Sequence, residues 1–307
     1  MIWFSIVIPL FNKRSEIEKA LDSIKFQTYQ NFEVIIINDG SDDGSQEVVT
    51  KWIKLNATES KTQYRLINQK NSGVSVARNN GIKESKYDYI ALLDADDLWV
   101  DDHLLALKML IEGYSEEVDL FSTSVIQLQN NKRIYPKLGR YEDFTGVVDF
   151  FKVSLISNGF IHPSSVCIKS KAIKGDLFPK QMKNYEDVIT WAKLSGNKGF
   201  GFCSNRSAVY VIDNAEASIH VDFNSYIQFD EILNSVEYDG KALYKIKFFL
   251  LHLLFCRMSM PLWCYLQAGK GFFGKNSTLF LLFLMGILVP RFLFCCKKDA
   301  RKLHRSK

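Results

Sequence analysis

The feature that most constrains the fold is an alternation of strand-type and helix-type patterns over the first 100 residues. Short apolar runs, typical of strands covered on both faces, are separated by stretches in which apolar residues recur at helical spacing. The expected strands are Phe4–Leu10, Phe32–Asn38, Tyr64–Asn68 and the run that begins at Tyr87. This alternation predicts an α/β fold whose mostly parallel central sheet is flanked by helices.

Local signals predict where these first elements begin and end. Pro9 has no N–H to donate and is expected to stop the first strand from extending as a central strand. Ser15 is the expected cap of the first helix, and the second helix is expected to begin at Ser45. The third helix, which carries Val76 and Ile82, is expected to end near Gly81 to Lys86.

After residue 100 the pattern predicts further elements of both kinds. We expect helices over 101–114, 150–157, 184–194 and 222–236, strands over 118–128, 133–136 and 208–212, and a loop followed by a strand over 161–168. Asn130-Asn131-Lys132 is expected to form a hairpin turn, and the polar stretch 137–146 a loop.

Acidic residues follow two of the expected parallel strands. Asp39 ends the second strand, and Asp94, Asp96 and Asp97 follow the fourth. Ligands of such sheets bind beyond the carboxyl ends of the strands. Closely spaced carboxylates repel one another unless a cation lies among them, and oxygen ligands suit Mg²⁺ or Mn²⁺. The cluster therefore predicts a metal that bridges protein and a phosphorylated ligand; a solvated acidic turn is the alternative.

A second acidic pair, Glu186-Asp187, lies at the expected start of a helix. Acids are favoured there by the helix dipole, so the pattern by itself is also explained without any catalytic role.

Charge is distributed unevenly along the chain. Residues 241–307 hold 13 Lys or Arg and one acid, for a net charge of +12, whereas residues 1–240 sum to −7. Basic charge beside apolar segments suits an anionic membrane surface better than a nucleic acid. The six cysteines show no metal-ligand spacing, and the chain opens without a secretory pattern, so we expect a reducing, cytoplasmic setting.

The apolar block at 279–290 is short for a membrane span, which needs roughly 17 to 25 residues. With the basic residues that follow, it is interpreted as a surface anchor or re-entrant segment. A single tilted span and a helical hairpin buried against protein are the alternatives.

Four sequence motifs, taken together, resemble the inverting glycosyltransferases of family 2, of the kind that build bacterial surface polysaccharides. They are Ile6 to Asn12, Asn38 to Ser45, Gly73 to Gly81 and Leu93 to Asp97. The resemblance continues more loosely through His162-Pro163-Ser164-Ser165 and Glu186-Asp187. It implies a GT-A (Rossmann-like) domain over residues 1–215, with a donor-binding half to about 100 and an acceptor half after it. A connecting helix (216–240) and a membrane-associating helical tail (241–307) would follow.

The resemblance also implies a donor site for a nucleotide-diphosphate sugar, and a UDP-sugar is the expected donor. Pro9, Asn12 and Asp39 would lie around the base, where a carboxylate can accept a bond from a ring N–H. Arg78 would lie near the nucleotide or diphosphate, although a surface arginine is the alternative. Asp94 would contact the ribose.

The implied chemistry divides between a metal and a base. Asp96, supported by Asp97, would hold Mn²⁺ or Mg²⁺ against the departing diphosphate. Asp187 would take the proton of the attacking acceptor hydroxyl, with Glu186 orienting the base or the acceptor.

Two departures from the family pattern refine this expectation. No Gln-x-x-Arg-Trp follows the Glu-Asp pair, which favours a non-processive enzyme. After Tyr210, where many relatives carry a basic or His residue, this chain has Val211-Ile212-Asp213-Asn214, and His220 lies too far along to be transferred.

The sequence therefore predicts a metal-dependent glycosyltransferase that acts on a glycan or lipid-linked acceptor at the cytoplasmic face of the plasma membrane. A non-catalytic sugar-nucleotide binder or assembly protein is the main alternative. A sugar nucleotidyltransferase is disfavoured because no Gly-rich triphosphate loop with a lysine follows the first strand. No nucleic-acid partner is expected, and the oligomeric state is not predicted.

Overall fold

The computed structural model describes residues 1–212, apart from 57–61, 155–156, 158, 181 and 183–185. The strands are β1 (Phe4–Leu10), β2 (Phe32–Asn38), β3 (Tyr64–Asn68), β4 (Tyr89–Leu92), β5 (Leu98–Trp99), β6 (Leu120–Gln129), β7 (Lys132–Ile134), β8 (Thr145–Val148), β9 (Val166–Lys169) and β10 (Phe200–Ile212). The helices are α1 (Ile17–Lys25), α2 (Ser45–Asn56), α3 (Val74–Lys83), α4 (His103–Tyr114), α5 (Phe150–Val153) and α6 (Glu186–Ser195), with 3₁₀ turns η1 (Gly139–Tyr141), η2 (Pro163–Ser165) and η3 (Ser170–Ala172).

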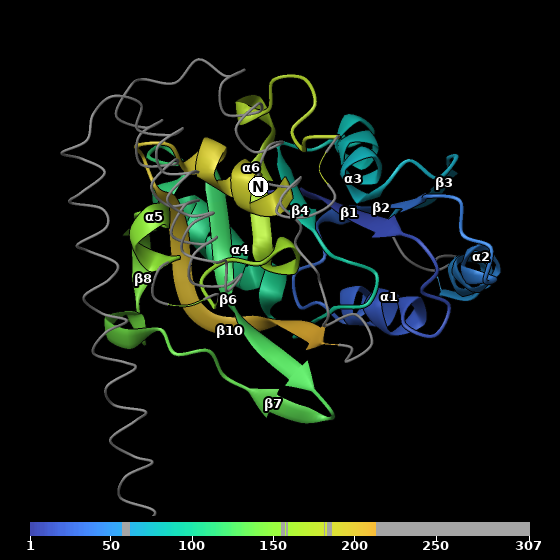
Figure 1. Ribbon diagram of the computed structural model, residues 1–307, viewed down its shortest axis with the longest axis horizontal. Helices are drawn as coiled ribbons and strands as arrows, with labels where there is room; N and C mark the ends of the chain where they lie inside the picture. Colours follow the sequence, from blue (N-terminus) through green and yellow to red (C-terminus); the bar gives the residue numbers. More distant parts are fainter. Residues whose placement is uncertain (57–61, 155–156, 158, 181, 183–185, 213–307) are drawn as a thin grey trace, which may run out of the picture. The chain divides into compact units, whose positions relative to one another are not determined.

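All ten strands belong to one sheet, with helices on both faces (Figure 1). The order along the sheet is β3-β2-β1-β4-β9-β6-β10-β5, with β7 paired to β6 and β8 to β10. The predicted α/β architecture is confirmed.

The sheet is parallel in its first half and mixed in its second. Strands β3, β2, β1 and β4 pair parallel to one another. Strand β9 then pairs antiparallel with both β4 and β6, and β10 pairs parallel with β6 but antiparallel with β5 and β8. Parallel pairing, as predicted, therefore holds for the first four strands and for the β6–β10 pair, and the sheet as a whole is mixed. Because β9 reverses direction between β4 and β6, the carboxyl ends of β1, β2, β4, β6 and β10 share one edge.

Strand β1 lies where the order of strands reverses, between β2 and β4. Its pairing with β2 extends to Leu10, whereas its pairing with β4 ends at Val7. Pro9 therefore lies in a central strand, contrary to our expectation. It pairs with Ile37 of β2 but lies beyond the last pairing of β1 with β4. The missing N–H of Pro9 is tolerated there, and the opening between β1 and β4 is the switch-point crevice in which such folds bind ligands.

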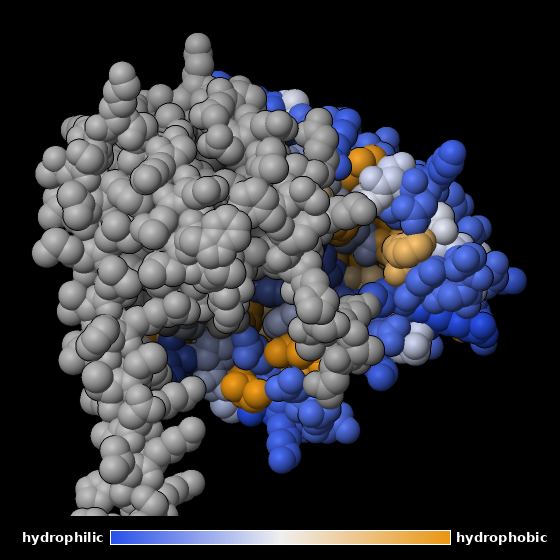
Figure 2. All heavy atoms as spheres, viewed as in Figure 1, coloured by the Kyte–Doolittle hydropathy of each residue, from blue (hydrophilic) through white to orange (hydrophobic). Residues whose placement is uncertain are grey.

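The two faces of the first strands have different coverings. A hydrophobic cluster includes Phe4, Ile6 and Ile8 together with Leu21 of α1 and Leu107 of α4. Helix α3 lies on the face opposite α1 and α2 (Figure 1). In the view of Figure 2 the outer surface over α1, α2 and β3 is mostly hydrophilic, as expected of amphipathic helices.

Helix α3 ends at Lys83, which confirms the predicted end between Gly81 and Lys86, and Gly81 itself lies inside the helix. A Cβ at this position would come 2.3 Å from Cγ1 of Val7, so the glycine lets α3 approach β1 closely. The prediction that Ser15 caps the first helix is wrong. Helix α1 begins at Ile17, its N-cap residue is Glu16, and no side chain makes a capping bond.

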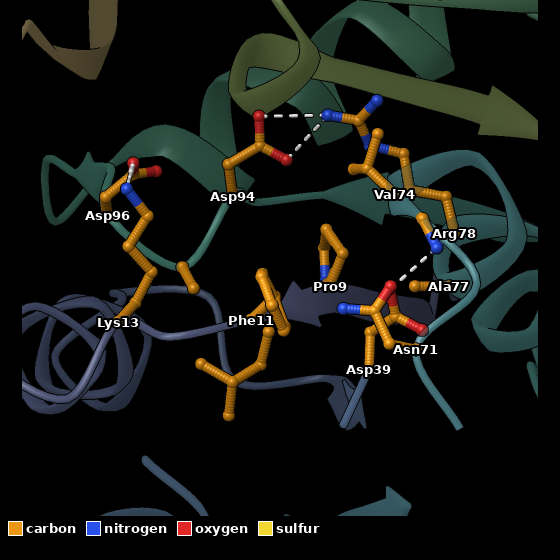
Figure 3. A pocket seen from close by; sticks show the side chains of 13 residues that line it. Pro9, Phe11, Lys13, Asp39, Asn71, Val74, Ala77, Arg78, Asp94 and Asp96 are labelled. Carbon is orange, nitrogen blue, oxygen red and sulfur yellow. Dashed lines mark hydrogen bonds and ion pairs between the residues drawn. The ribbon is translucent and has the colours of Figure 1, made fainter. Parts of the chain in front are cut away.

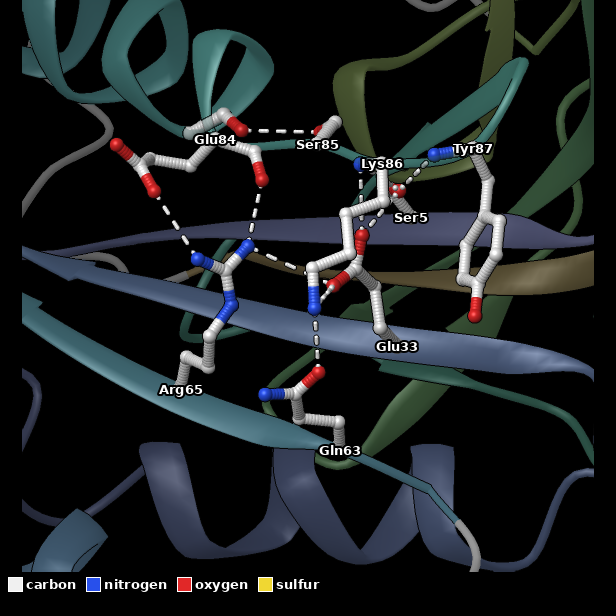
Figure 4. Close-up of polar contacts among 9 residues, drawn as sticks. Ser5, Glu33, Gln63, Arg65, Glu84, Ser85, Lys86 and Tyr87 are labelled. Carbon is white, nitrogen blue, oxygen red and sulfur yellow. Dashed lines mark hydrogen bonds and ion pairs between the residues drawn. The ribbon is translucent and has the colours of Figure 1, made fainter.

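A buried polar cluster lies near the amino ends of β1 and β2 (Figure 4). Glu33, only 2% exposed, accepts bonds from the Ser5 hydroxyl (2.7 Å) and the Lys86 backbone N–H (2.8 Å). Arg65 lies 3.5 Å from the same carboxylate and 3.0 Å from Glu84. The cluster fixes the loop between α3 and β4, at the edge of the sheet away from the strand carboxyl ends.

Other predicted elements are confirmed with changed limits. The β6–β7 hairpin turns at Asn130 and Asn131, both with positive φ, as the sequence indicated. Strand β8 forms within and beyond the stretch that we expected to be loop, and β10 begins at Phe200, eight residues earlier than predicted. The predictions for 216–240 and 241–307, including the 222–236 helix and the apolar block, lie outside the described residues. No helix within the described residues is long and apolar enough to cross a membrane.

Candidate active site

A cavity of about 450 Å³ lies at the carboxyl ends of β1, β2 and β4 (Figure 3). Its wall comes from the loops that follow these strands and from the start of α3. The lining residues are Pro9, Leu10, Phe11, Lys13, Asp39, Asn71, Gly73, Val74, Ala77, Arg78, Asp94, Ala95 and Asp96. Most of the residues predicted to bind the donor thus meet in one space, although they are separated by up to 87 positions in the sequence.

Asp39 is a buried carboxylate that organises the loop before α3. It accepts bonds from the Gln69 side chain (2.7 Å) and from the backbone N–H groups of Ser72 and Gly73 (both 2.8 Å). A carboxylate has about four lone-pair sites, so one remains for a ligand donor. Asp39 lines the cavity, where its predicted contact with a base requires it to be.

Arg78 is a buried cation at the back of the cavity. Its Nη2 donates to both oxygens of Asp94, at 2.8 and 3.0 Å, and its Nη1 donates to Oε1 of Glu186 at 2.9 Å. The guanidinium also lies over the ring of Phe178, 5.2 Å from its centroid. The side chain is 4% exposed, so the alternative of a surface helix arginine is wrong.

Asp96 lies at the opposite end of the cavity from Arg78. Its Oδ2 is 2.9 Å from Nζ of Lys13, and the two side chains are 27% and 23% exposed. Burial and the neighbouring Asp94 raise the pKa of Asp96, while Lys13 opposes the shift. Sequence reasoning missed Lys13, which carries no motif of its own and becomes significant only because β1 and β4 are adjacent.

Asp97 points away from the cavity. It is 1% exposed, accepts bonds from the Ser164 hydroxyl and the Val211 backbone N–H (2.9 Å), and lies 3.6 Å from Nδ1 of His162. Burial, together with Asp94 and Asp96, raises the pKa of Asp97 well above its ordinary range. Asp97 therefore anchors the acidic turn to η2 and to the end of β10.

His162 and Ser164 complete this anchor. Ser164 accepts a bond from the backbone N–H of Asp94 (3.1 Å), and its carbonyl accepts one from the Trp99 indole (2.6 Å). Burial lowers the pKa of His162 to about 4, and its ring lies 4.3 Å from that of Tyr210. The His162-Pro163-Ser164-Ser165 motif thus shapes the acidic turn from behind.

Glu186 and Asp187 begin α6, on the far side of Arg78 from the cavity lining. Burial and the charge of Asp187 raise the pKa of Glu186 to about 7. Burial also raises the pKa of Asp187, whose Oδ1 accepts a bond from the Val188 N–H (2.7 Å). Asp187 is half-buried and is not among the cavity-lining residues. Its neighbour Glu186 bonds to Arg78, which does line the cavity.

Two residues beside the end of β1 differ in where their side chains lie. Asn12 is exposed and exchanges bonds with Asp42, so it ties two loops together outside the cavity lining. Phe11, which we had not singled out, lines the cavity and is 45% exposed, so its ring is available to a ligand. The end of β1 thus offers Pro9 and Phe11 to the cavity.

The carboxylates present suit a cation that is held jointly with a ligand. Among the described residues, no group of three or more His, Cys, Asp or Glu side chains is arranged to hold a metal. Both oxygens of Asp94 are bonded to Arg78, which leaves Asp96 as the accessible carboxylate. Mg²⁺ normally takes one or two carboxylates and completes its shell with water and substrate phosphates, so this donor set fits Mg²⁺ or Mn²⁺ with a diphosphate present.

Comparison with known proteins agrees with this geometry. The profile of the family described as "Glycosyl transferase family 2" matches residues 5–167, just over half of the chain. An uncharacterized glycosyltransferase of Rickettsia bellii is 31% identical over 253 residues, which are 81% of this chain and 34% of the relative. The chain thus spans about a third of that relative's length.

Two solved structures share the fold. TarS of S. aureus, residues 1–349, in complex with UDP-GlcNAc, superposes with a TM-score of 0.70 at 18% identity, covering 88% of this chain and 80% of that one. The mannosyltransferase PcManGT of Pyrobaculum calidifontis, in complex with GDP-Man and Mn²⁺, superposes with a TM-score of 0.55 at 16% identity, covering 93% and 86%. The chain therefore has the GT-A fold, and it belongs to glycosyl transferase family 2.

Proposed function

We propose that this glycosyltransferase moves a sugar from a UDP-sugar to a hydroxyl of a glycan or lipid-linked acceptor, with inversion and one sugar at a time. The observation that carries the proposal is the single cavity that unites Asp39, Arg78, Asp94 and Asp96 at the switch point of the sheet. Arg78 connects this cavity to the start of α6, where the proposed base lies.

The nucleoside would occupy the part of the cavity near β1 and β2. Asp39 keeps one acceptor position for a ring N–H, and the exposed ring of Phe11 can stack on a base. Asn71 contributes a side chain that can donate or accept on the same wall. The choice of uridine is supported by this acceptor chemistry and by the UDP-GlcNAc complex of TarS.

The diphosphate would lie toward Asp96. A bound Mg²⁺ or Mn²⁺ supplies positive charge that stabilises the departing diphosphate. Asp96 would hold that ion, Asp94 would contact the ribose while Arg78 fixes its carboxylate, and Asp97 would hold the turn in shape. Support comes from the exposure of Asp96 and from the Mn²⁺ in the structure of PcManGT.

Asp187 would act as the general base. Inversion requires the acceptor hydroxyl to attack from the side opposite the diphosphate, so the base must lie across the cavity from Asp96. Asp187 is the second residue of α6, and its neighbour Glu186 is bonded to Arg78, at the end of the cavity away from Asp96; this arrangement supports the assignment. Burial raises the pKa of Asp187, and the positive charge of Arg78 opposes this shift by favouring the ionised form, which can accept a proton.

We further propose that residues 241–307 attach the enzyme to the cytoplasmic face of the plasma membrane. Their net charge of +12 beside apolar segments suits an anionic lipid surface. A lipid-linked acceptor would explain why a catalytic domain carries such a segment.

A panel of nucleotide sugars, each incubated with the full chain and Mn²⁺, tests the proposal. We expect slow release of the nucleoside diphosphate from at least one UDP-sugar and its suppression by EDTA, with water as the acceptor. Release that exhaustive chelation leaves unchanged would contradict the metal assignment. Tight nucleotide binding without release or transfer would favour a non-catalytic binder.

A further inference from the structure

The ion pair between Lys13 and Asp96 sets a positive charge where the proposed metal would lie. Lys13 follows β1 and Asp96 follows β4, so the pair spans the opening of the crevice (Figure 3). The distance of 2.9 Å is that of a direct charge-assisted hydrogen bond. An ammonium and a divalent cation cannot both occupy the same position beside one carboxylate oxygen.

The backbone of Lys13 is fixed, whereas its side chain can move. The Lys13 N–H donates to the Ser45 hydroxyl at 3.0 Å, and the Lys13 carbonyl accepts from the N–H groups of Glu16 and Ile17. The ammonium, by contrast, is carried by a flexible four-carbon stem in a partly exposed position. It can therefore leave Asp96 and remain within the cavity.

The charges of the lining residues indicate what the Lys13 ammonium would contact after leaving Asp96. Among the described lining residues the cations are Lys13 and Arg78, and Arg78 is already bonded to Asp94 and Glu186. A nucleoside diphosphate brings at least two negative charges into a cavity that also holds three carboxylates, so it requires additional positive charge. Lys13 is the lining cation with the more exposed side chain, 23% against 4%.

We propose that Lys13 and the divalent cation compete for Asp96, and that Lys13 contacts the donor diphosphate once the cation has taken its place. This inference rests on the proposed function and adds a donor-recognition residue to it. The enzyme would thereby avoid an unpaired Asp96 when no donor is bound, and it would bind metal and nucleotide cooperatively.

The test is to measure Mn²⁺ and UDP binding by calorimetry for the wild type and for Lys13→Met, which keeps the length of the side chain without its charge. Lys13→Met should bind Mn²⁺ alone about threefold more tightly, because a competing cation is gone. It should bind UDP in EDTA about tenfold more weakly, because a charge-assisted bond to phosphate is lost. Lys13→Arg should retain UDP binding within about threefold, and Lys108→Met, which removes a surface ion pair with Glu112, should behave as wild type.

Equal UDP affinity of Lys13→Met and wild type in EDTA would overturn the diphosphate contact. Equal Mn²⁺ affinity of the two proteins would overturn the competition. If the wild type bound neither UDP nor GDP, with or without Mn²⁺, the proposed function itself would fail and this inference with it. Measured melting temperatures identify any variant whose folding is impaired; if Lys13→Met is one, Lys13→Gln, which also removes the charge, replaces it in the UDP and Mn²⁺ comparisons.

Discussion

Arg78 and Glu186 lie 108 residues apart in the chain, yet their side chains form a buried ion pair with an N–O distance of 2.9 Å. The same guanidinium holds both oxygens of Asp94. One side chain therefore fixes the position of a donor-site carboxylate relative to the helix that carries the proposed base. The contact of Arg78 with Asp94 and Glu186 could not be predicted from the sequence, because it forms only where α3 and α6 meet.

Replacing Arg78 with Met should lower the free energy of unfolding by about 3–5 kcal/mol, because Asp94 and Glu186 would be left without their cation in a buried site. Arg206→Met removes the exposed pair with Glu142 and should cost less than about 1 kcal/mol. Urea denaturation of both variants gives the comparison. If both variants lost the same free energy of unfolding, the buried ion pairs of Arg78 would not stabilise the fold more than a surface pair does.

Replacing Glu186 with Gln should flatten the dependence of stability on pH. The pKa of Glu186 is raised from 4.5 to about 7 in the folded chain, so its protonated form is the stabilising one. That contribution is fully present below pH 4.5 and is lost as the pH rises through about 7. Between pH 5 and 8 the unfolding free energy should fall by about 1–3 kcal/mol more in wild type than in Glu186→Gln.

Glu142→Gln is the control for this pH series. Hydrogen bonds from Leu138 and Arg206 lower the pKa of Glu142, so its contribution is lost only as the pH falls through the lowered pKa. Its stability curve should run parallel to that of wild type from pH 5 to 8. A Glu186→Gln curve that is also parallel to wild type would contradict the raised pKa.

Asp96→Ala should impair metal binding, whereas Asp97→Ala should lower stability. Asp96→Ala removes a partly exposed carboxylate whose Lys13 partner can be solvated instead, so stability should change by less than about 1 kcal/mol while Mn²⁺ binding in the presence of UDP is lost. Asp97→Ala leaves Ser164 and the Val211 N–H without a buried acceptor and should cost about 1–3 kcal/mol. Calorimetry and denaturation distinguish the two effects. If stable Asp97→Ala lost Mn²⁺ binding while Asp96→Ala kept it, the assignments would be reversed.

The tail should bind anionic membranes. The full chain is expected to float with vesicles that contain phosphatidylserine and to be released by high salt, whereas a chain ending at Asp239 should not float. The matched control is the full chain with its basic residues in 297–307 changed to Gln, which should float weakly. Equal flotation of the full and shortened chains would contradict a membrane role for the tail.

Much of the first half of the fold could be predicted because its signals are local. The first three strands have the limits read from the sequence. Phe4–Leu10 and Phe32–Asn38 are buried along their whole length, and Tyr64–Asn68, at the edge of the sheet, is half-buried. The second half depends on pairings such as Ala91 with Cys167, which no local pattern encodes, so the antiparallel pairing of β9 with β4 and β6 was not predicted.

The site shows the same division. The acidic residues could be named from their positions after strands and from family resemblance. The roles of their neighbours could not: Lys13 faces Asp96, and Ser164 bonds to Asp97, only in the folded chain. Asp97 is an example. Its place in the acidic motif predicts a role in metal binding, whereas its burial and its bonds to Ser164 and Val211 indicate a structural role.

The most direct test of the central claim is the rate of nucleoside diphosphate release by Asp187→Asn, measured with the donor that the panel identifies, alongside its affinity for UDP and Mn²⁺. Asp176→Asn, which removes a surface partner of Lys83 and Lys180, serves as the control. General-base assistance is worth about 10²- to 10⁴-fold, so Asp187→Asn should release product at less than about a tenth of the wild-type rate while binding UDP normally. Retention of more than about a tenth of the wild-type rate, with UDP binding intact, would contradict the account by removing Asp187 from the role of base.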